Sequence, residues 1–337
     1  MRKLSFLFWL CLTAVSLVTL SASKRPQAGS SGGVPVATVV TVLGPKFTPP
    51  PAVSKDDIVV REGQDRKEVV DWVPAQGDKA GLQLAIVVDD SGPKDVGKQF
   101  EDLGNFIRSL PGSTAVGVFY ANNSTITIAS QFTPDHEAAA KALRLPLGNS
   151  ATMSLYQSLM ALIAGWPVSG ARREMLILAD GFDRLRRERY SPDVNTTVDK
   201  AQAAGIIFHA IFIASGQFSG VGGQAQRNVH GGQSPGVGSQ SQRTSSRIQT
   251  VKNVGQGNLN TLTDGTGGYA FFQGFATPIS FDPFLTQLDM ILKNQYFLGW
   301  QTGRSKDSKG ELRDFKISIE RGGVELRAAP KVFVPGG

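Results

Sequence analysis

The sequence predicts an α/β fold: a Rossmann-like domain with a central, mainly parallel sheet flanked by helices, beside a β-sandwich-like module. First, strand-like and helix-like runs alternate through the middle of the chain. Second, the strand-like runs there are apolar throughout, as expected of a parallel sheet buried on both faces; they are residues 82–88, 174–179 and 206–214. Third, both ends of the chain, residues 34–73 and 295–334, are rich in β-branched and aromatic residues.

The elements follow in order from these patterns. In the N-terminal part, a strand is predicted at residues 34–43 and a hairpin from residues 57–62 and 67–73. In the middle part, apolar residues at helical spacing predict helices at 95–110, 154–166, 194–204 and 283–293. Further strands are predicted at residues 114–120, 124–129, 269–272, 295–302, 313–320 and 324–334.

Domain boundaries are placed where the composition changes. We predict a flexible start at residues 24–33, an N-terminal β module at 34–76, the α/β domain at 80–294 and a C-terminal β module at 295–335 that pairs with 34–76. Residues 215–258 are dominated by Gly, Gln and Ser. Such a stretch buries too little apolar surface to order itself, which predicts a disordered insertion.

The first residues have the layout of a secretory signal peptide over residues 1–23. Met1-Arg2-Lys3 is cationic, residues 4–20 are almost wholly apolar, and Ser21-Ala22-Ser23 is suited to cleavage. The alternative is an uncleaved anchor, for which the apolar run is short. Export predicts a periplasmic, cell-surface or extracellular protein with no transmembrane segment after cleavage. The single cysteine, Cys11, would leave with the peptide.

Composition also limits the classes of partner. The 337 residues are 41% hydrophobic, and the net charge is +7. The basic residues are scattered rather than gathered into a stripe, and aromatic residues do not alternate with them. This pattern does not favour nucleic-acid binding.

Candidate site residues lie where two apolar strands end. Asp89, Asp90 and Ser91 follow the strand at 82–88, and Asp180 follows the strand at 174–179. Ligands of open parallel sheets bind at the carboxyl ends of the strands, and carboxylate and hydroxyl oxygens suit a hard cation such as Mg²⁺. The alternative is that Asp and Ser serve as helix caps and turn residues there.

A phosphate-binding loop is a second alternative. Residues 92–98 (GPKDVGK) fit GxxxxGK between a strand and a helix. Gln99 stands where Ser or Thr should hold Mg²⁺, and nearby aspartates would repel phosphate. Both features argue against a phosphate-binding loop. The enzymatic alternative is an exported hydrolase or NTPase that uses Asp89 and Asp180. No HExxH motif is present, and His209 lies in an apolar run typical of a core position.

Four segments, in this order, resemble a von Willebrand factor type A (VWA) domain: LAIVVDDSG (84–92), SLYQSL (154–159), REMLILADGFD (173–183) and AAGIIFHAIFI (203–213). The flanking segments resemble the exported VWFA-related proteins common in Acidobacteria. The resemblance implies a non-enzymatic protein-binding (adhesion or interaction) protein with a metal-ion-dependent adhesion site, whose open metal position takes an acidic side chain of the partner.

The resemblance implies Asp89, Ser91, Asp180 and Thr152 as metal ligands, with Mg²⁺ as the cofactor and Mn²⁺ or Ca²⁺ as substitutes. The match is incomplete. Pro93 replaces a serine ligand, and Met153 stands at the threonine position, with Thr152 one residue early. A metal-independent structural scaffold of the same fold is therefore an alternative. A cluster that begins at Arg184 could attract an acidic partner or form a solvated helix face; its other members are Arg186, Arg187 and Arg189.

Overall fold

The α/β domain is built around the apolar strand predicted at residues 82–88. The computed structural model describes residues 33–148, 154–185, 191–214 and 253–336. Strand β5 (Leu82–Asp89) is buried along its whole length. Six strands form the sheet in the order β10-β9-β8-β5-β6-β7. The other five are β6 (Thr114–Asn122), β7 (Thr125–Thr133), β8 (Arg172–Ala179), β9 (Ile206–Phe212) and β10 (Ala270–Phe271). Only β7 runs antiparallel to its neighbour, which confirms the predicted fold class.

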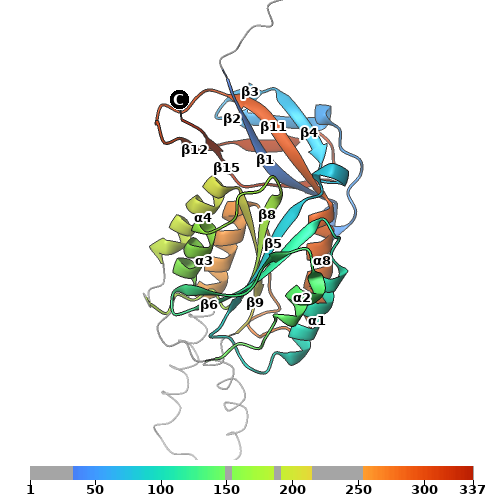
Figure 1. Ribbon diagram of the computed structural model, residues 1–337. Helices are drawn as coiled ribbons and strands as arrows, with labels where there is room; N and C mark the ends of the chain where they lie inside the picture. Colours follow the sequence, from blue (N-terminus) through green and yellow to red (C-terminus); the bar gives the residue numbers. More distant parts are fainter. Residues whose placement is uncertain (1–32, 149–153, 186–190, 215–252, 337) are drawn as a thin grey trace, which may run out of the picture. The chain divides into compact units, whose positions relative to one another are not determined.

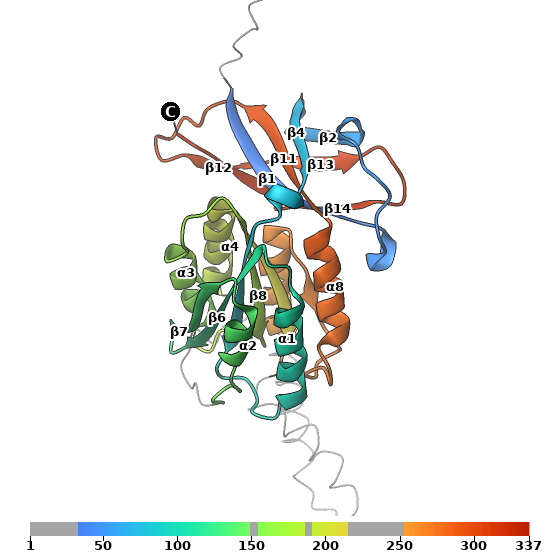
Figure 2. The same ribbon diagram turned by 45° about the vertical axis from the view of Figure 1, so that its right-hand side comes forward.

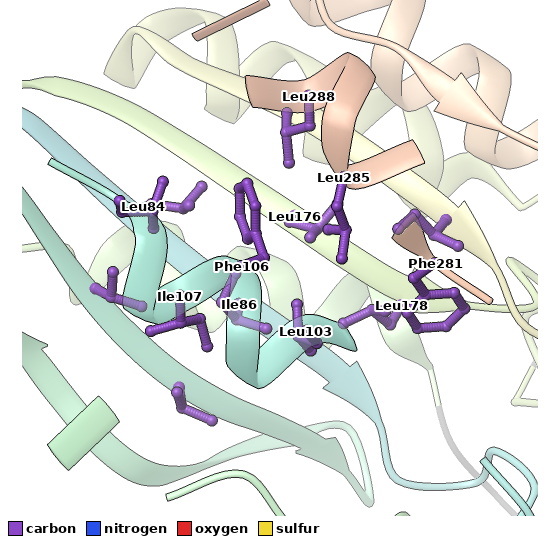
Figure 3. Close-up of a cluster of buried hydrophobic side chains, with 14 of the residues drawn as sticks. Leu84, Ile86, Leu103, Phe106, Ile107, Leu176, Leu178, Phe281, Leu285 and Leu288 are labelled. Atoms are coloured by element: carbon purple, nitrogen blue, oxygen red, sulfur yellow. The ribbon is translucent and has the colours of Figure 1, made fainter. Parts of the chain in front are cut away.

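Helices cover both faces of this sheet (Figures 1 and 2). One face packs against α1 (Gly97–Ser109), α2 (His136–Lys141) and α8 (Asp282–Lys293). The other packs against α3 (Leu155–Ala164), α4 (Pro192–Ala204) and a helix at 253–266. Successive side chains of β5 alternate between the two cores, because strand side chains point to opposite faces. Figure 3 shows the first core, to which β5 contributes Leu84 and Ile86, α1 contributes Leu103 and α8 contributes Leu285.

The helix at 253–266 differs from the predicted insertion. Residues 215–252 lie outside the described residues, but residues 253–258, the last part of the predicted insertion, are helical. Leu259 and Leu262 are fully buried on the sheet, and the helix that carries them begins earlier than the apolar residues alone indicated. The predicted signal peptide at 1–23 also lies outside the described residues. Within the described ranges, no helix is both long and apolar enough to span a membrane.

Strands from the two ends of the chain form the predicted β module. One sheet has the order β14-β1-β11-β4, from β14 (Glu325–Arg327), β1 (Val34–Leu43), β11 (Gln295–Thr302) and β4 (Val69–Pro74). A second joins β13 (Lys316–Ile319), β2 (Ile58–Glu62) and β3 (Asp65–Lys67), and β12 (Glu311–Asp314) pairs with β15 (Lys331–Val334). Short 3-10 turns occupy Pro45–Phe47, Lys55–Asp57 and Gly77–Lys79. Trp300 and Phe315 pack in the core between the sheets.

Two details of the β module differ from the prediction. The hairpin predicted from residues 57–62 and 67–73 is divided, because β2 pairs with β3 whereas β4 pairs with β11 in the other sheet. The strand predicted at 313–320 is interrupted at Phe315. The Phe315 side chain is buried in the module core, and its N–H donates to the Pro330 carbonyl at 3.1 Å, which is the last bond in the register of β12 with β15 before the chain passes to β13 in the other sheet.

The β module lies at the amino ends of the parallel strands (Figure 1). Arg172, at the start of β8, is buried there. Its guanidinium donates to the carbonyls of Leu292 at 3.1 Å and Ala80 at 3.4 Å, and to the side chain of Gln295. These contacts join β8 to the segments that enter and leave the β module. The carboxyl ends of the strands, where ligands are expected, therefore face away from it.

Candidate functional site

The tip of β5 folds back on the carboxylate of Asp89. Asp89 is 3% exposed. Its Oδ1 accepts hydrogen bonds from the Ser91 backbone N–H at 2.9 Å and from the Ser91 hydroxyl at 2.6 Å. A carboxylate that accepts from the backbone two residues later is a common turn device of Asp. The structure therefore brings Asp89 and Ser91 together, and it also supports the turn role that the sequence analysis kept as an alternative.

Asp90 belongs to a different set of contacts. Its carboxylate is completely buried and accepts two hydrogen bonds from the Arg144 guanidinium at 2.7 and 2.9 Å. The backbone N–H of Leu147 at 2.9 Å and the side chain of Asn122 at 3.0 Å complete the shell. Burial acts to raise the pKa of Asp90, but these donors outweigh it and lower the pKa. Asp90 thus anchors the loop around Leu147.

Asp180 directly follows β8 and accepts a hydrogen bond from the N–H of Phe182 at 2.9 Å, which repeats the turn made by Asp89. The residue between them, Gly181, has a positive φ of 70°. An added Cβ there would lie 2.3 Å from the carbonyl oxygen of Gly255. The positive φ and this close approach both require glycine, and the turn that it permits brings the next residues back toward Asp180.

Arg184 lies between the two aspartates that the sequence predicts as metal ligands. Its Nη1 is 3.6 Å from Asp89 Oδ2 and 3.4 Å from Asp180 Oδ1, and its Nη2 is bonded to Asp180 Oδ2. The Arg184 side chain is only 7% exposed. Sequence reasoning placed this arginine in a surface cluster. The signal that could have identified it is the i, i+4 spacing from Asp180 across a glycine turn.

The electrostatics of the cluster follow from its burial. Burial raises the pKa of Asp89 to about 6 against the opposing charge of Arg184, and the neighbouring Asp180 adds to the rise. Burial acts to lower the pKa of Arg184, but the charges of Asp180 and Asp89 outweigh it, so its pKa is raised. The guanidinium therefore stays charged between the carboxylates.

The loop before α3 makes other contacts. Ser154, the N-cap of α3, donates its hydroxyl to Asp183 at 3.3 Å, and Ser191 donates to the same carboxylate oxygen at 2.7 Å. Asp183 is thus a buried acceptor that ties α3 to the segment before α4. Thr152 and Met153, the residues predicted at the threonine position, lie outside the described residues.

A divalent cation does not fit this arrangement of side chains. Mg²⁺ demands near-octahedral oxygen ligands at about 2.0–2.1 Å, whereas the oxygens of Asp89 and Asp180 face the guanidinium or donors of their own turns. Over the described ranges, no group of three His, Cys, Asp or Glu residues could hold a metal ion. Mg²⁺ could reach these oxygens only if Arg184 moved. The metal site stays a prediction.

The phosphate-loop alternative rests on Lys98. In the structure Lys98 lies in the first turn of α1, and its ammonium is bound by Asp102 of the same helix at 2.6 Å. His209 is fully buried, with Nε2 2.8 Å from a Glu174 oxygen, and its Nδ1 accepts from the Tyr269 N–H at 3.2 Å. Both side chains are held by structural contacts.

Comparisons with known proteins find distant structural likenesses. No protein-family model matches the chain, and no curated protein matches it. Among solved structures, a von Willebrand factor type A protein from Catenulispora acidiphila is 10% identical with a TM-score of 0.38, covering 91% of this chain and 75% of that one. The pilus adhesin SpaC from Lactobacillus rhamnosus GG is 12% identical with a TM-score of 0.41, covering 83% and 47%. An aerotolerance-related membrane protein from Bacteroides fragilis is 9% identical with a TM-score of 0.38, covering 63% and 98%. Likenesses this distant carry no statement about function.

Proposed function

We propose that the chain is an exported, non-enzymatic protein-binding protein of the VWA type that binds its partner at the carboxyl edge of the six-stranded sheet. The observation that carries this proposal is the group of exposed apolar side chains in the loops at that edge. We call them the edge residues: Leu145, Leu147, Leu185 and Ile279. All four lie in loops at the same edge of the sheet, and exposed apolar surface of this kind is a mark of protein-interaction sites.

The loops that carry the edge residues are held in place by hydrogen bonds. The N–H of Leu147 donates to Asp90 at 2.9 Å, and the N–H of Leu185 donates to Asp183 at 3.0 Å. Beside Ile279, the carbonyl of Pro278 accepts from Gln99 of α1 at 2.6 Å. A surface whose backbone is already ordered loses less entropy on binding than a mobile one.

The charges at the centre of this edge are satisfied within the chain. Asp89, Asp180 and Arg184 are buried and paired with one another. This arrangement favours a partner that contributes apolar side chains over one that contributes a carboxylate to a metal ion. The pairing of these charges supports partner binding that does not depend on a metal ion. The experiment below also tests metal-dependent adhesion.

The experiment is capture of partners from the exported fraction by the mature chain, with and without chelator. Intact mass of the exported chain checks cleavage near Lys24. We expect Ile279→Asp to reduce capture of a specific partner about tenfold or more, because a charge introduced at an apolar contact costs binding energy. The matched control is Val168→Asp, since Val168 is 94% exposed and Ile279 is 82% exposed, and Val168 precedes β8 at the opposite edge.

Three results would contradict the proposal. If Val168→Asp reduces capture as much as Ile279→Asp, the carboxyl edge is not the binding surface. If chelator abolishes capture by the unaltered chain, binding depends on a metal. If the chain turns over nucleotide and Asp89→Asn abolishes this activity, the enzymatic alternative replaces the binding function.

A further inference from the structure

The oxygens of the two predicted metal-ligand carboxylates face partners supplied by the chain itself. Oδ1 of Asp89 accepts from the Ser91 N–H and hydroxyl, and Oδ2 faces Arg184 Nη1 at 3.6 Å. Oδ1 of Asp180 accepts from the Phe182 N–H and from Arg184 Nη1, and Oδ2 is bonded to Arg184 Nη2. The side chain of Pro93, where the family has a serine, offers no oxygen.

A free ion cannot easily displace Arg184 from this site. It follows Asp180 by four residues and is joined to it by the tight turn at Gly181. The guanidinium is therefore present at the site at an effective concentration set by a short tether, which for short linkers is in the millimolar range or above. A divalent cation would have to expel a buried arginine or lie beside it, and two cations at close range repel.

We infer that the Arg184 guanidinium takes the place of a divalent cation at this site, holding the loops after β5 and β8 together as a cation that belongs to the chain. The inference goes beyond the proposed binding function, because it concerns the composition of the site whether or not a partner binds. It predicts that the site forms at any concentration of divalent metal and that it gains metal binding only when the guanidinium is removed.

The test is thermal unfolding of the mature chain and its variants in chelator and in millimolar Mg²⁺ or Mn²⁺. The unaltered chain should melt at the same temperature in both conditions. Arg184→Gln should lower the melting temperature in chelator by about 5 °C or more, because it leaves two buried carboxylates unpaired. Adding metal should restore part of this loss, because the freed oxygens can then bind a cation that stabilises the folded state by mass action.

Arg144→Gln is the matched control. It removes the guanidinium partner of another buried aspartate, Asp90, outside the predicted metal site, so it should lower stability without creating a metal response. Arg184→Lys keeps a cation on the same tether and should show no metal response, which preserves the test if Arg184→Gln does not fold. A metal response of the unaltered chain that Asp89→Asn abolishes would overturn the inference. So would an unchanged melting temperature of Arg184→Gln in chelator, or a folded Arg184→Gln variant that metal does not stabilise.

Discussion

Asp89 and Asp90 are neighbours in the sequence, yet their carboxylates have opposite environments. Asp90 accepts a bidentate pair from Arg144, and its pKa is lowered despite burial. Asp89 receives fewer charged contacts, and burial raises its pKa to about 6. In a strand, successive side chains point to opposite sides, so the end of β5 directs one carboxylate toward Asp180 and the other toward the Arg144 loop. Only Asp89 is therefore placed to contribute to the predicted metal site.

Asp102 provides a prediction at the residue scale, because its charge stabilises the contact between α1 and the segment before α8. Its buried carboxylate accepts from Lys98 at 2.6 Å, Ser280 at 2.6 Å and the Phe281 N–H at 2.9 Å. Burial acts to raise the pKa of Asp102, but these donors lower it below its ordinary value of 3.8. A lowered folded-state pKa means that the charged form is the stabilising one.

We therefore expect Asp102→Asn to be less stable than the unaltered chain at pH 7, by about 1–3 kcal/mol. The difference should be constant above pH 5 and narrow as the pH falls through 3.8 and below, where the native carboxylate becomes protonated. Urea unfolding at several pH values measures this difference. Asp314→Asn, which alters an exposed carboxylate, is the control and should show almost no difference at any pH. If the difference in stability between Asp102→Asn and the unaltered chain increased in acid, the charged form of Asp102 would not be the stabilising one.

At the scale of elements, the turn after β8 determines whether Arg184 reaches the two aspartates. Gly181 and Gly205 both have positive φ values, 70° and 63°, but only Gly181 is tightly packed. A Cβ on Gly181 would overlap the Gly255 carbonyl, whereas a Cβ on Gly205, at the end of α4, meets no atom within 4 Å. The two glycines therefore separate the cost of backbone conformation from the cost of overlap.

Gly205→Ala should cost about 1–2 kcal/mol, the conformational cost of a left-handed residue. Gly181→Ala should cost that amount and about 1–3 kcal/mol more, because the helix at 253–266 must move away from the turn. Urea unfolding of the two variants beside the unaltered chain measures both values. Equal losses would show that the close approach of Gly181 to Gly255 does not contribute to stability.

The elements differ in how far the sequence alone predicts them. The apolar runs identify the strands of the central sheet, because burial on both faces leaves a continuous hydrophobic pattern. The site is predicted in part: Asp89, Ser91 and Asp180 follow from their places at strand ends. Arg184 does not, because its role depends on a turn and on the distance between two loops, and a charged residue in a run of arginines reads as exposed. The change of sheet between β3 and β4 leaves no pattern in the sequence.

At the scale of the whole molecule, the α/β domain and the β module are expected to unfold together. Arg172 bonds across their junction, and α8 ends at Lys293, directly before β11 begins at Gln295. In the variant Trp166→Phe, the tryptophans that remain among the described residues are Trp72 and Trp300. Both pack in the core of the β module. Its fluorescence then reports on the β module, while circular dichroism reports on the helices.

The two signals should give one coincident thermal transition. The additional substitution Arg172→Gln should lower that transition, because it removes buried bonds on both sides of the junction. The control is Arg321→Gln, whose side chain donates to the Ala52 carbonyl in an exposed contact within the β module. Separate transitions in Trp166→Phe alone would show that the two parts unfold independently.

The pairing of β1 with β11 also determines the order in which the chain can fold. Val40 faces Tyr296 across this ladder, and β14 is the other neighbour of β1, so β1 has no partner in its sheet until the later strand β11 has been synthesised. Closing a loop of that length at random is entropically costly. The α/β domain removes much of this cost, because once it has folded, its last helix brings Asn294 beside Val42, whose N–H donates to the Asn294 carbonyl at 2.8 Å. The domain is therefore expected to act as the folding template for the β module, and β1 is exposed to pairing with other chains until that template exists.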